Sequence, residues 1–202
     1  MSTVNVVNPL ANPKGVKLLC ELCKKPAHLL CEDCRVTYYC GHEHKHLDFE
    51  GIHKKICSTI KYIKTKSMFL SSEEERRLFE ETMFLKKLSI IETSRTIAQK
   101  FLFEGHYHTA IPAAMQALKM AIELYGLGSV ELVPSYLSLG EASIGTGDLK
   151  QAEEYLTQAE WTVLKGVCPS ALKYKLFRIQ GMLKAARGEN EAALEMFADD
   201  VI

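Results

Sequence analysis

Residues 20–57 read CELCKKPAHLLCEDCRVTYYCGHEHKHLDFEGIHKKIC and hold six of the seven cysteines of this 202-residue chain. The order of the donors is CxxC, CxxC, CxxxH and HxxxC, which concentrates eight soft ligands in one stretch. Two thiolates separated by a tight turn can face one ion at about 2.3 Å. A segment this short cannot build a hydrophobic core of its own. The spacing therefore predicts a module that is built around metal.

The donors suffice for two complete zinc sites. Two Cys3His sites would use all of them and leave no open position for water or substrate, which is typical of structural rather than catalytic zinc. We therefore expect two structural Zn2+ ions as the cofactors of this chain. The expected ligands are Cys20, Cys23, Cys31, Cys34, Cys40, His44, His53 and Cys57.

A disulfide framework is the alternative use of six cysteines. Residues 1–12 lack the basic region followed by an apolar stretch that marks a secretory signal. In a reducing compartment, cysteines at this spacing indicate metal binding rather than disulfides. We therefore favour zinc and expect a cytoplasmic protein.

The two CxxC pairs, the run Tyr38-Tyr39-Cys40 and the final His-x3-Cys pair resemble a MYND-type zinc finger. The resemblance implies a short β-hairpin, with one strand in residues 36–39, followed by a helix. It also implies interleaved ligation of two ions. One zinc would be held by Cys20, Cys23, Cys40 and His44, and the other by Cys31, Cys34, His53 and Cys57.

The stretch departs from the usual MYND pattern in three ways. His44 stands where most members have cysteine, and its neighbours His42 and His46 are alternative ligands, although the spacing of three residues after Cys40 favours His44. Phe49 lies near the usual tryptophan, and the gap between His44 and His53 is one residue longer than usual. Histidine keeps the site competent for zinc.

Fingers of this type bind short proline-rich peptides beside the hairpin, so the resemblance also implies a peptide groove. Tyr38 and Phe49 are the aromatic candidates for its lining, although packing inside the finger is the alternative role for both.

Charge divides the chain into two modules. Residues 1–70 contain 11 Lys and Arg and 6 Asp and Glu, whereas residues 71–202 contain 14 and 19. We expect a flexible N-terminal lead at 1–16, the finger at 17–58, a linker or basic helix at 59–71, and a helical region at 72–202.

Five lysines follow the finger closely, and a solvated helix face is favoured over a nucleic-acid surface. They are Lys54, Lys55, Lys61, Lys64 and Lys66.

A long helix is predicted directly after the linker. Ser72 and Glu75 form a capping-box pattern, in which each side chain accepts a hydrogen bond from the other residue's backbone amide. Residues 73–104 contain neither Gly nor Pro, and their apolar residues recur at threes, fours and sevens. As one helix this segment would be about 48 Å long, unless it breaks once.

The helical region contains a repeat. Glycines at 105, 147 and 188 are each followed five residues later by alanine, and a small residue precedes each by seven positions. The small residue allows two helices to approach closely, and the glycine permits the turn between them. The pattern resembles tetratricopeptide repeats in a variant of about 42 residues, with the third repeat incomplete. An irregular helical bundle is the alternative.

Such arrays usually bind through a concave face that the first helices of the repeats form. The candidate residues on this face are Arg95, Gln99, Tyr136, Glu141 and Arg178. The apolar residues after Gly188 predict that further repeats or a partner cover the last helix. Cys168 is predicted to be a free thiol, and Trp161 a packing residue in the second helix of the second repeat.

The order of a finger and a helical array resembles non-enzymatic MYND-finger adaptors of motile cilia and sperm flagella. The resemblance implies a cytoplasmic scaffold of the axoneme, associated with dynein-arm complexes, with axonemal or other tetratricopeptide-containing proteins as partners. Membranes and nucleic acids are not expected as partners. The alternative is a regulatory or remnant relative of the MYND-containing lysine methyltransferases, but only about 14 residues separate Cys57 from Ser72, where their catalytic domain would lie.

Overall fold

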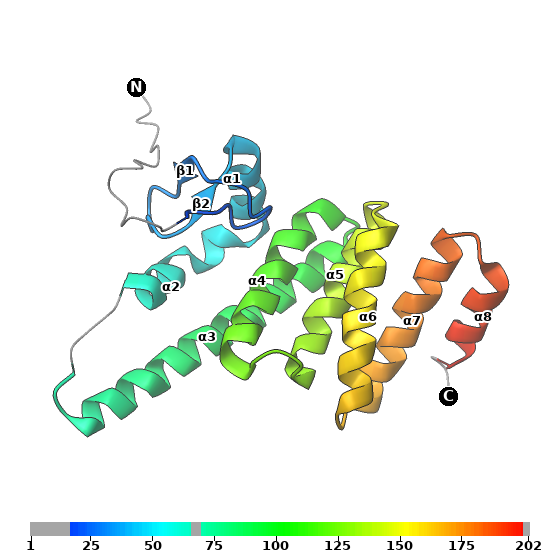
Figure 1. The fold of residues 1–202 in the computed structure, drawn as a ribbon. Coiled ribbons are helices and arrows are strands. Elements are labelled where there is room, and N and C mark those ends of the chain that lie inside the picture. Colours follow the sequence, from blue (N-terminus) through cyan, green and yellow to red (C-terminus); the bar gives the residue numbers. More distant parts are fainter. Residues whose placement is uncertain (1–16, 66–69, 200–202) are drawn as a thin grey trace. The chain divides into compact units, whose positions relative to one another are not determined.

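The computed structural model describes residues 17–65 and 70–199, and these are mainly helical, with one small hairpin near the start (Figure 1). This confirms the predicted fold class. Two compact units are present, residues 1–90 and 91–202, and their boundary lies within helix α3 (Glu73–Phe103). Among the described residues, none of the helices is long and apolar enough to span a membrane.

The finger contains very little regular sheet. Strand β1 (Leu29–Leu30) pairs antiparallel with β2 (Tyr38–Tyr39), so the observed strand is shorter than the predicted 36–39. Cysteines make up most of the buried cluster beneath it, which consists of Cys20, Leu29, Cys31, Cys34 and Tyr39. A core made of thiols offers little apolar surface, so metal binding has to supply much of the folding free energy.

A continuous helical segment completes the finger. Helix α1 (His42–Asp48) passes into a π-helical turn, η2 (Phe49–His53), and then into α2 (Lys54–Thr65). A π-helical turn accommodates one residue more than an α-helical turn. It therefore explains how the chain tolerates the extra residue between His44 and His53 without a break in the helix.

Helix α3 begins as the capping box predicts. The Glu75 amide donates to Ser72 Oγ at 3.1 Å, and the Ser72 amide donates to Glu75 Oε2 at 3.3 Å. The helix then runs through 31 residues without a break.

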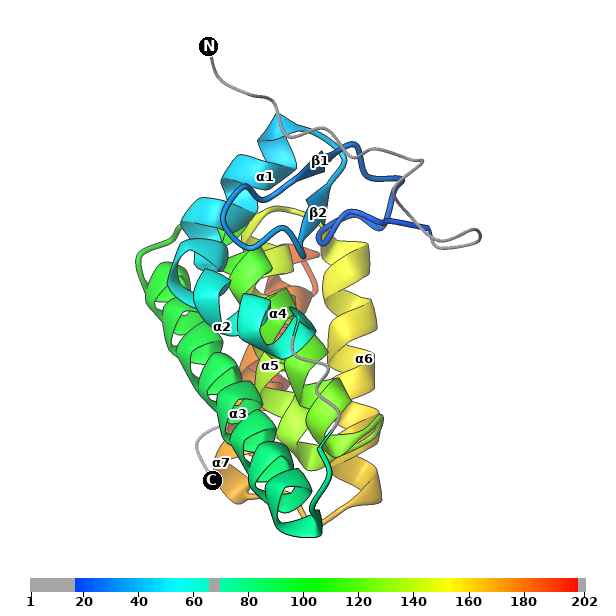
Figure 2. The ribbon, with the colours of Figure 1, turned by 90° about the vertical axis from the view of Figure 1, so that its left-hand side faces the viewer.

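The remaining helices form pairs with α3 and with one another. The first pair is α3 and α4 (Tyr107–Tyr125), the second α5 (Val133–Gly145) and α6 (Leu149–Lys165), and the third α7 (Ser170–Ala186) and α8 (Asn190–Asp199). A 3-10 turn, η3 (Val130–Leu132), precedes α5. From α4 to α8 the helices follow one another in a row in Figure 1, and Figure 2 looks along that row.

The turns inside the three pairs have the same backbone conformation. Gly105, Gly147 and Gly188 have φ values of +76°, +82° and +81°. After each glycine, the next amide donates to the carbonyl five residues earlier, as in a Schellman motif. These bonds are His106 to Phe101 at 2.8 Å, Asp148 to Ser143 at 2.9 Å and Glu189 to Lys184 at 3.0 Å. Three copies of one turn show that the glycine spacing reflects a structural repeat.

Small residues allow close helix packing within the second and third pairs. A Cβ atom on Gly140 would lie 3.0 Å from Leu156 Cδ2, and one on Gly181 would lie 2.6 Å from Phe197 Cε1. The alanines that follow each turn, Ala110, Ala152 and Ala193, are buried. The predicted role of the small residues is therefore confirmed for these pairs.

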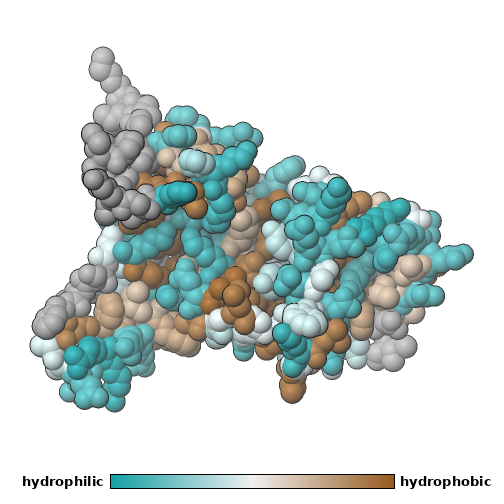
Figure 3. All heavy atoms as spheres, in the orientation of Figure 1, coloured by the Kyte–Doolittle hydropathy of each residue, from teal (hydrophilic) through white to brown (hydrophobic). Residues whose placement is uncertain are grey.

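Two predictions for the array concern Trp161 and the apolar residues after Gly188. The predicted packing residue Trp161 is 56% exposed, with Lys165 Nζ at 4.4 Å from its ring centroid, so it lies largely on the surface rather than in the core. Leu164 and Val167 are also exposed nearby. Figure 3 shows hydrophobic spheres scattered among hydrophilic ones on the face that it presents. Ala193 is buried and Leu194 exposed in α8, whereas residues 201 and 202 lie outside the described residues.

Cys168 packs into the core of the second and third pairs. Its Sγ lies 3.6 Å from the Pro169 carbonyl oxygen, and burial raises the pKa of the thiol. A buried thiol with a raised pKa reacts slowly because little thiolate is present.

Candidate metal centres and binding surfaces

The two CxxC pairs adopt the same turn. The residue after each pair, Lys24 or Arg35, has a φ of 58°. The Lys24 amide donates to the Cys20 carbonyl at 3.1 Å, and the Arg35 amide donates to the Cys31 carbonyl at 3.0 Å. The left-handed conformation is uncommon for residues other than glycine. Sequence reasoning therefore found the pairs but not the backbone geometry that directs both sulfurs to one side.

The first cluster combines the first CxxC pair with the third pair of donors. The donor atoms of Cys20, Cys23, Cys40 and His44 all lie within 4.8 Å of one another. His44 Nδ1 lies 3.5 Å from Cys20 Sγ and 3.2 Å from Cys40 Sγ, and Cys23 Sγ lies 3.6 Å from Cys40 Sγ. The structure thus brings together the set that the MYND resemblance implied for one zinc.

The second cluster combines the second CxxC pair with the last pair of donors. The donor atoms of Cys31, Cys34, His53 and Cys57 also lie within 4.8 Å of one another. His53 Nε2 lies 3.2 Å from Cys31 Sγ and 3.6 Å from Cys34 Sγ, and Cys31 Sγ lies 3.9 Å from Cys57 Sγ. Three of these four residues are buried, against one of four in the first cluster.

The distances within both clusters fit tetrahedral zinc. With Zn–S bonds of about 2.3 Å and Zn–N bonds of about 2.0 to 2.1 Å, a tetrahedron has S to S edges of about 3.8 Å and S to N edges of about 3.6 Å. The sulfur pairs Cys23–Cys40 and Cys31–Cys57 lie at 3.6 and 3.9 Å, and the sulfur to nitrogen distances given above are 3.2 to 3.6 Å. Each cluster supplies four protein donors, so a bound zinc has no open position for substrate.

The pKa values of the thiols in the second cluster also favour a bound cation. Burial acts to raise the pKa of Cys34, but hydrogen bonds with His53 and Thr37 outweigh it and lower that pKa to about 6. Burial and the neighbouring sulfurs of Cys34 and Cys31 raise the pKa of Cys57 to about 12. A metal ion deprotonates coordinating thiols and compensates their charge. The prediction of two structural zinc ions therefore agrees with the chemistry of the donors.

Behind His53 lies a buried polar chain that sequence reasoning missed. Tyr39 Oη donates to Asp48 Oδ2 at 2.6 Å, and the same carboxylate oxygen lies 3.7 Å from His53 Nδ1. Burial, and then the Asp48 carboxylate, raise the pKa of Tyr39. A carboxylate beside the distal nitrogen of a ligating histidine fixes its tautomer and orientation. The Asp48 carboxylate is thus close enough to act electrostatically on His53, whose Nε2 faces the second zinc site.

The histidines that flank His44 lie elsewhere. His42 and His46 line a cavity of about 420 Å³ beside the second CxxC pair. Phe49 lines the same cavity, whereas Tyr38, the other aromatic candidate for a peptide groove, is not among its lining residues. These residues are Cys31, Glu32, Asp33, His42, Lys45, His46 and Phe49.

Two of the lysines after the finger fasten α2 to it. Lys61 Nζ donates to the Asp33 carbonyl at 2.9 Å. Lys64 Nζ donates to the Val36 carbonyl and to Glu21 Oε1, both at 3.0 Å. Lys61 and Lys64 are exposed, as predicted for a solvated helix face, and they also bond to the finger; Lys66 lies outside the described residues. Their spacing of three residues on one helix face was the signal in the sequence.

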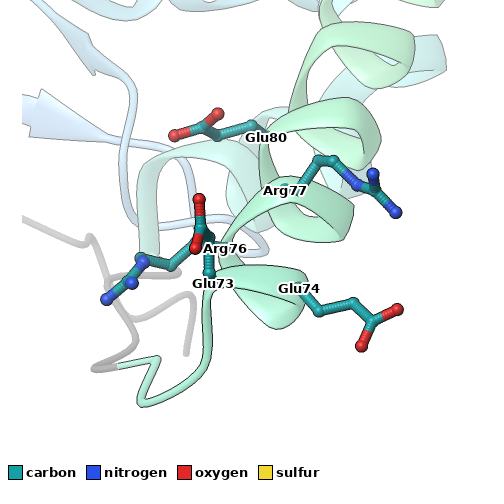
Figure 4. A pocket seen from close by; sticks show the side chains of 5 residues that line it. All are labelled: Glu73, Glu74, Arg76, Arg77 and Glu80. Carbon is teal, nitrogen blue, oxygen red and sulfur yellow. The ribbon is translucent and has the colours of Figure 1, made fainter.

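The first turns of α3 carry charges of both signs around a shallow surface depression. Figure 4 shows Glu73, Glu74, Arg76, Arg77 and Glu80 pointing in different directions from the helix. Because these side chains do not converge, the depression is a solvated helix end rather than a candidate site.

A groove on the array is lined by residues of the three first helices, α3, α5 and α7. Three of the predicted face residues, Gln99, Glu141 and Arg178, line it. The other two have packing roles instead, because Arg95 donates to the Glu131 carbonyl and Tyr136 packs against the core of the second pair.

The MYND finger family model matches residues 20–57, the stretch that supplies all eight donors of the two clusters. MYND domains generally mediate contacts between proteins. Residues 20–57 are thus a MYND finger with two structural zinc sites.

Proposed function

We propose that this protein is a non-enzymatic adaptor, in which a MYND finger and a tetratricopeptide-like array present separate binding surfaces for other proteins. The observation that carries the proposal is the closure of both metal clusters by four protein donors each. Zinc held in this way stabilises a fold and offers no position at which a substrate could be activated.

The two surfaces have different expected partners. On the finger, Phe49 and the cavity beside the second CxxC pair support binding of a proline-rich peptide, because such peptides dock into grooves lined by aromatic side chains. On the array, the groove that α3, α5 and α7 line supports binding of a folded or helical segment of a partner protein.

We further propose that the protein acts in the cytoplasm of motile cilia or sperm flagella, as part of dynein-arm-associated complexes of the axoneme. This part of the proposal rests on the resemblance to ciliary MYND-finger adaptors.

Affinity purification of the complete chain from ciliated cells tests the proposal. We expect axonemal proteins to be recovered with the wild-type chain, and different subsets to be lost when the finger is disordered by Cys31→Ser and when the array groove is altered. Recovery of no axonemal proteins would contradict the ciliary role. Binding of S-adenosylmethionine in calorimetry would contradict the non-enzymatic assignment and favour a methyltransferase relative.

A further inference from the structure

Two histidines of the finger lie on one face of α1 and take no part in the zinc clusters. His42 and His46 are four residues apart on this helix, so their Cβ atoms are neighbours at about 5 to 6 Å. Both residues are exposed, and neither side chain makes a hydrogen bond or an ion pair with any residue that the structure describes. Two histidines at this spacing on a helix can bind one metal ion through both imidazole rings.

A carboxylate is available beside the histidine pair. The cavity of about 420 Å³ that both histidines line is also lined by Glu32 and Asp33 of the second CxxC turn. Lys45 Nζ donates to Glu32 Oε1 at 3.1 Å, whereas the Asp33 carboxylate makes no hydrogen bond or ion pair within residues 17–65 and 70–199. The cavity thus gathers two imidazole rings and one carboxylate that no interaction in the finger uses.

The charge around the cavity favours a cation. Cys31 also lines the cavity and is a ligand of the second cluster, in which three thiolates and one Zn2+ carry one net negative charge. Among the described residues that line the cavity, Lys45 is the one cation, and its ion pair with Glu32 offsets its charge. The Asp33 carboxylate and the cluster therefore leave a negative environment around the two histidines.

The donors of the cavity are arranged more loosely than those of the two clusters. Within the described part of the chain, only the two clusters bring three or more donor atoms within 4.8 Å of one another. The exposed side chains of the cavity have to rotate to meet an ion, which costs side-chain entropy. With fewer than four protein donors, water completes the coordination. Binding here should therefore be weaker than in the clusters and readily reversible.

We propose that His42 and His46 form a third, exchangeable metal site, with Asp33 as its carboxylate ligand and a divalent transition-metal ion such as Zn2+ as its occupant. Imidazole selects such ions over Mg2+ and Ca2+, which prefer oxygen ligands. In metalloprotease helices with this histidine spacing, the glutamate after the first histidine is the general base. Here that glutamate is Glu43, which does not line the cavity, so the geometry supports metal binding and not hydrolysis.

The test starts from the complete chain, loaded with two zinc ions and freed of excess metal by gel filtration. Zn2+ is the probe, because it has no redox chemistry and its exchange into the clusters changes nothing. Isothermal titration calorimetry should show one further ion per chain with a Kd below about 1 mM. His42→Ala combined with His46→Ala should weaken this binding at least about tenfold, because both imidazole ligands are lost.

Matched variants separate the site from other surface donors. His28→Ala removes an exposed histidine of the same finger that does not line the cavity, so the Kd should change by less than about twofold. Asp33→Asn should weaken binding, whereas Glu43→Gln, which removes an equal charge from α1 outside the cavity, should not. Mg2+ at the same concentration should not displace the third zinc.

The proposal is overturned if the titration shows no third ion, or if His28→Ala weakens binding as much as the double histidine variant does. Displacement by Mg2+ at equal concentration would also overturn it, because it would indicate an unspecific attraction to carboxylates. If the double variant keeps only one zinc after gel filtration, one of its two histidines is a ligand of a structural cluster and no third site exists. Each of these outcomes leaves the adaptor function in place, since partner recovery tests that function separately.

Discussion

The finger and the helical array are stabilised in different ways, the finger by metal binding and the array by apolar helix packing. The finger buries thiols and pairs two residues of each strand, so its structure depends on charge compensation by metal. The array buries alanines and branched apolar residues, and glycines set both its turns and its closest helix contacts. We therefore expect a loss of metal to unfold the finger and leave the array unchanged. A change of side-chain volume in the array should destabilise the array and leave the finger unchanged.

Zinc removal should have the largest effect. In zinc-finger peptides the metal contributes on the order of 10 to 16 kcal/mol and is inseparable from folding. We expect two zinc ions per chain by elemental analysis, and chelation should unfold the finger while most of the helical circular dichroism persists. One zinc per chain, or loss of most of the helical signal, would contradict the comparison.

Thiol alkylation followed by mass spectrometry gives a sharper version of this experiment. Chelation should expose the six cysteines of the finger, whereas Cys168 should stay unmodified because it is buried in the array and its pKa is raised. Cys168 should react only when urea unfolds the array.

Gly145→Ala should test the packing of the array. A Cβ atom at this position would lie 2.3 Å from Tyr107 Cγ, so either the ring or the helix must move. We expect a loss of up to about 3 kcal/mol in urea unfolding of the array, although alanine is normally better than glycine in a helix. Gly140→Ala serves as the milder comparison, because its nearest atom is Leu156 Cδ2 at 3.0 Å. A stabilising effect of Gly145→Ala would refute the close contact.

Asp48→Asn should weaken one metal site and not the other. Loss of a carboxylate that orients a ligating histidine typically lowers metal affinity about 10- to 100-fold. Competition with a chelator should therefore remove one zinc from the variant earlier than from the wild type. Tyr39→Phe, which removes the hydroxyl that donates to Asp48 but keeps the carboxylate, should have a smaller effect of the same kind. Equal weakening of both sites would show that Asp48 acts on the fold of the whole finger.

Lys64→Met should have the smallest effect, on the attachment of α2 to the finger. The variant loses two hydrogen bonds, to Glu21 and to the Val36 carbonyl, and we expect a loss of about 1 kcal/mol in finger stability. Lys55→Met on the same helix is the control, because the Lys55 side chain makes no hydrogen bond or ion pair with the described residues of the finger. If both variants have the same effect, the contacts of Lys64 contribute nothing specific.

Much of the metal centre could be predicted, since ligand chemistry is carried by residue type and spacing. The grouping of Cys20 with His44, and of Cys31 with Cys57, follows from the MYND pattern. The left-handed turns at Lys24 and Arg35 and the role of Asp48 could not be predicted in this way, because they depend on which backbone groups meet after folding.

In the array, too, the local turns could be predicted from the sequence, whereas the exposure of single side chains could not. Its glycine and alanine spacing predicted three turns of one kind, because a positive φ and a close helix contact both select small residues. Helical periodicity did not reveal that Trp161 is exposed, since the width of the buried face depends on how the neighbouring helices pack.

Residue types and their local spacing were enough to predict two closed zinc clusters and a series of similar helix pairs. The packing of α3, α5 and α7 settled which of the candidate face residues line one groove, namely Gln99, Glu141 and Arg178. Such a groove is formed by side chains from three helices that are far apart in the chain, and their relative placement follows from packing rather than from any local pattern.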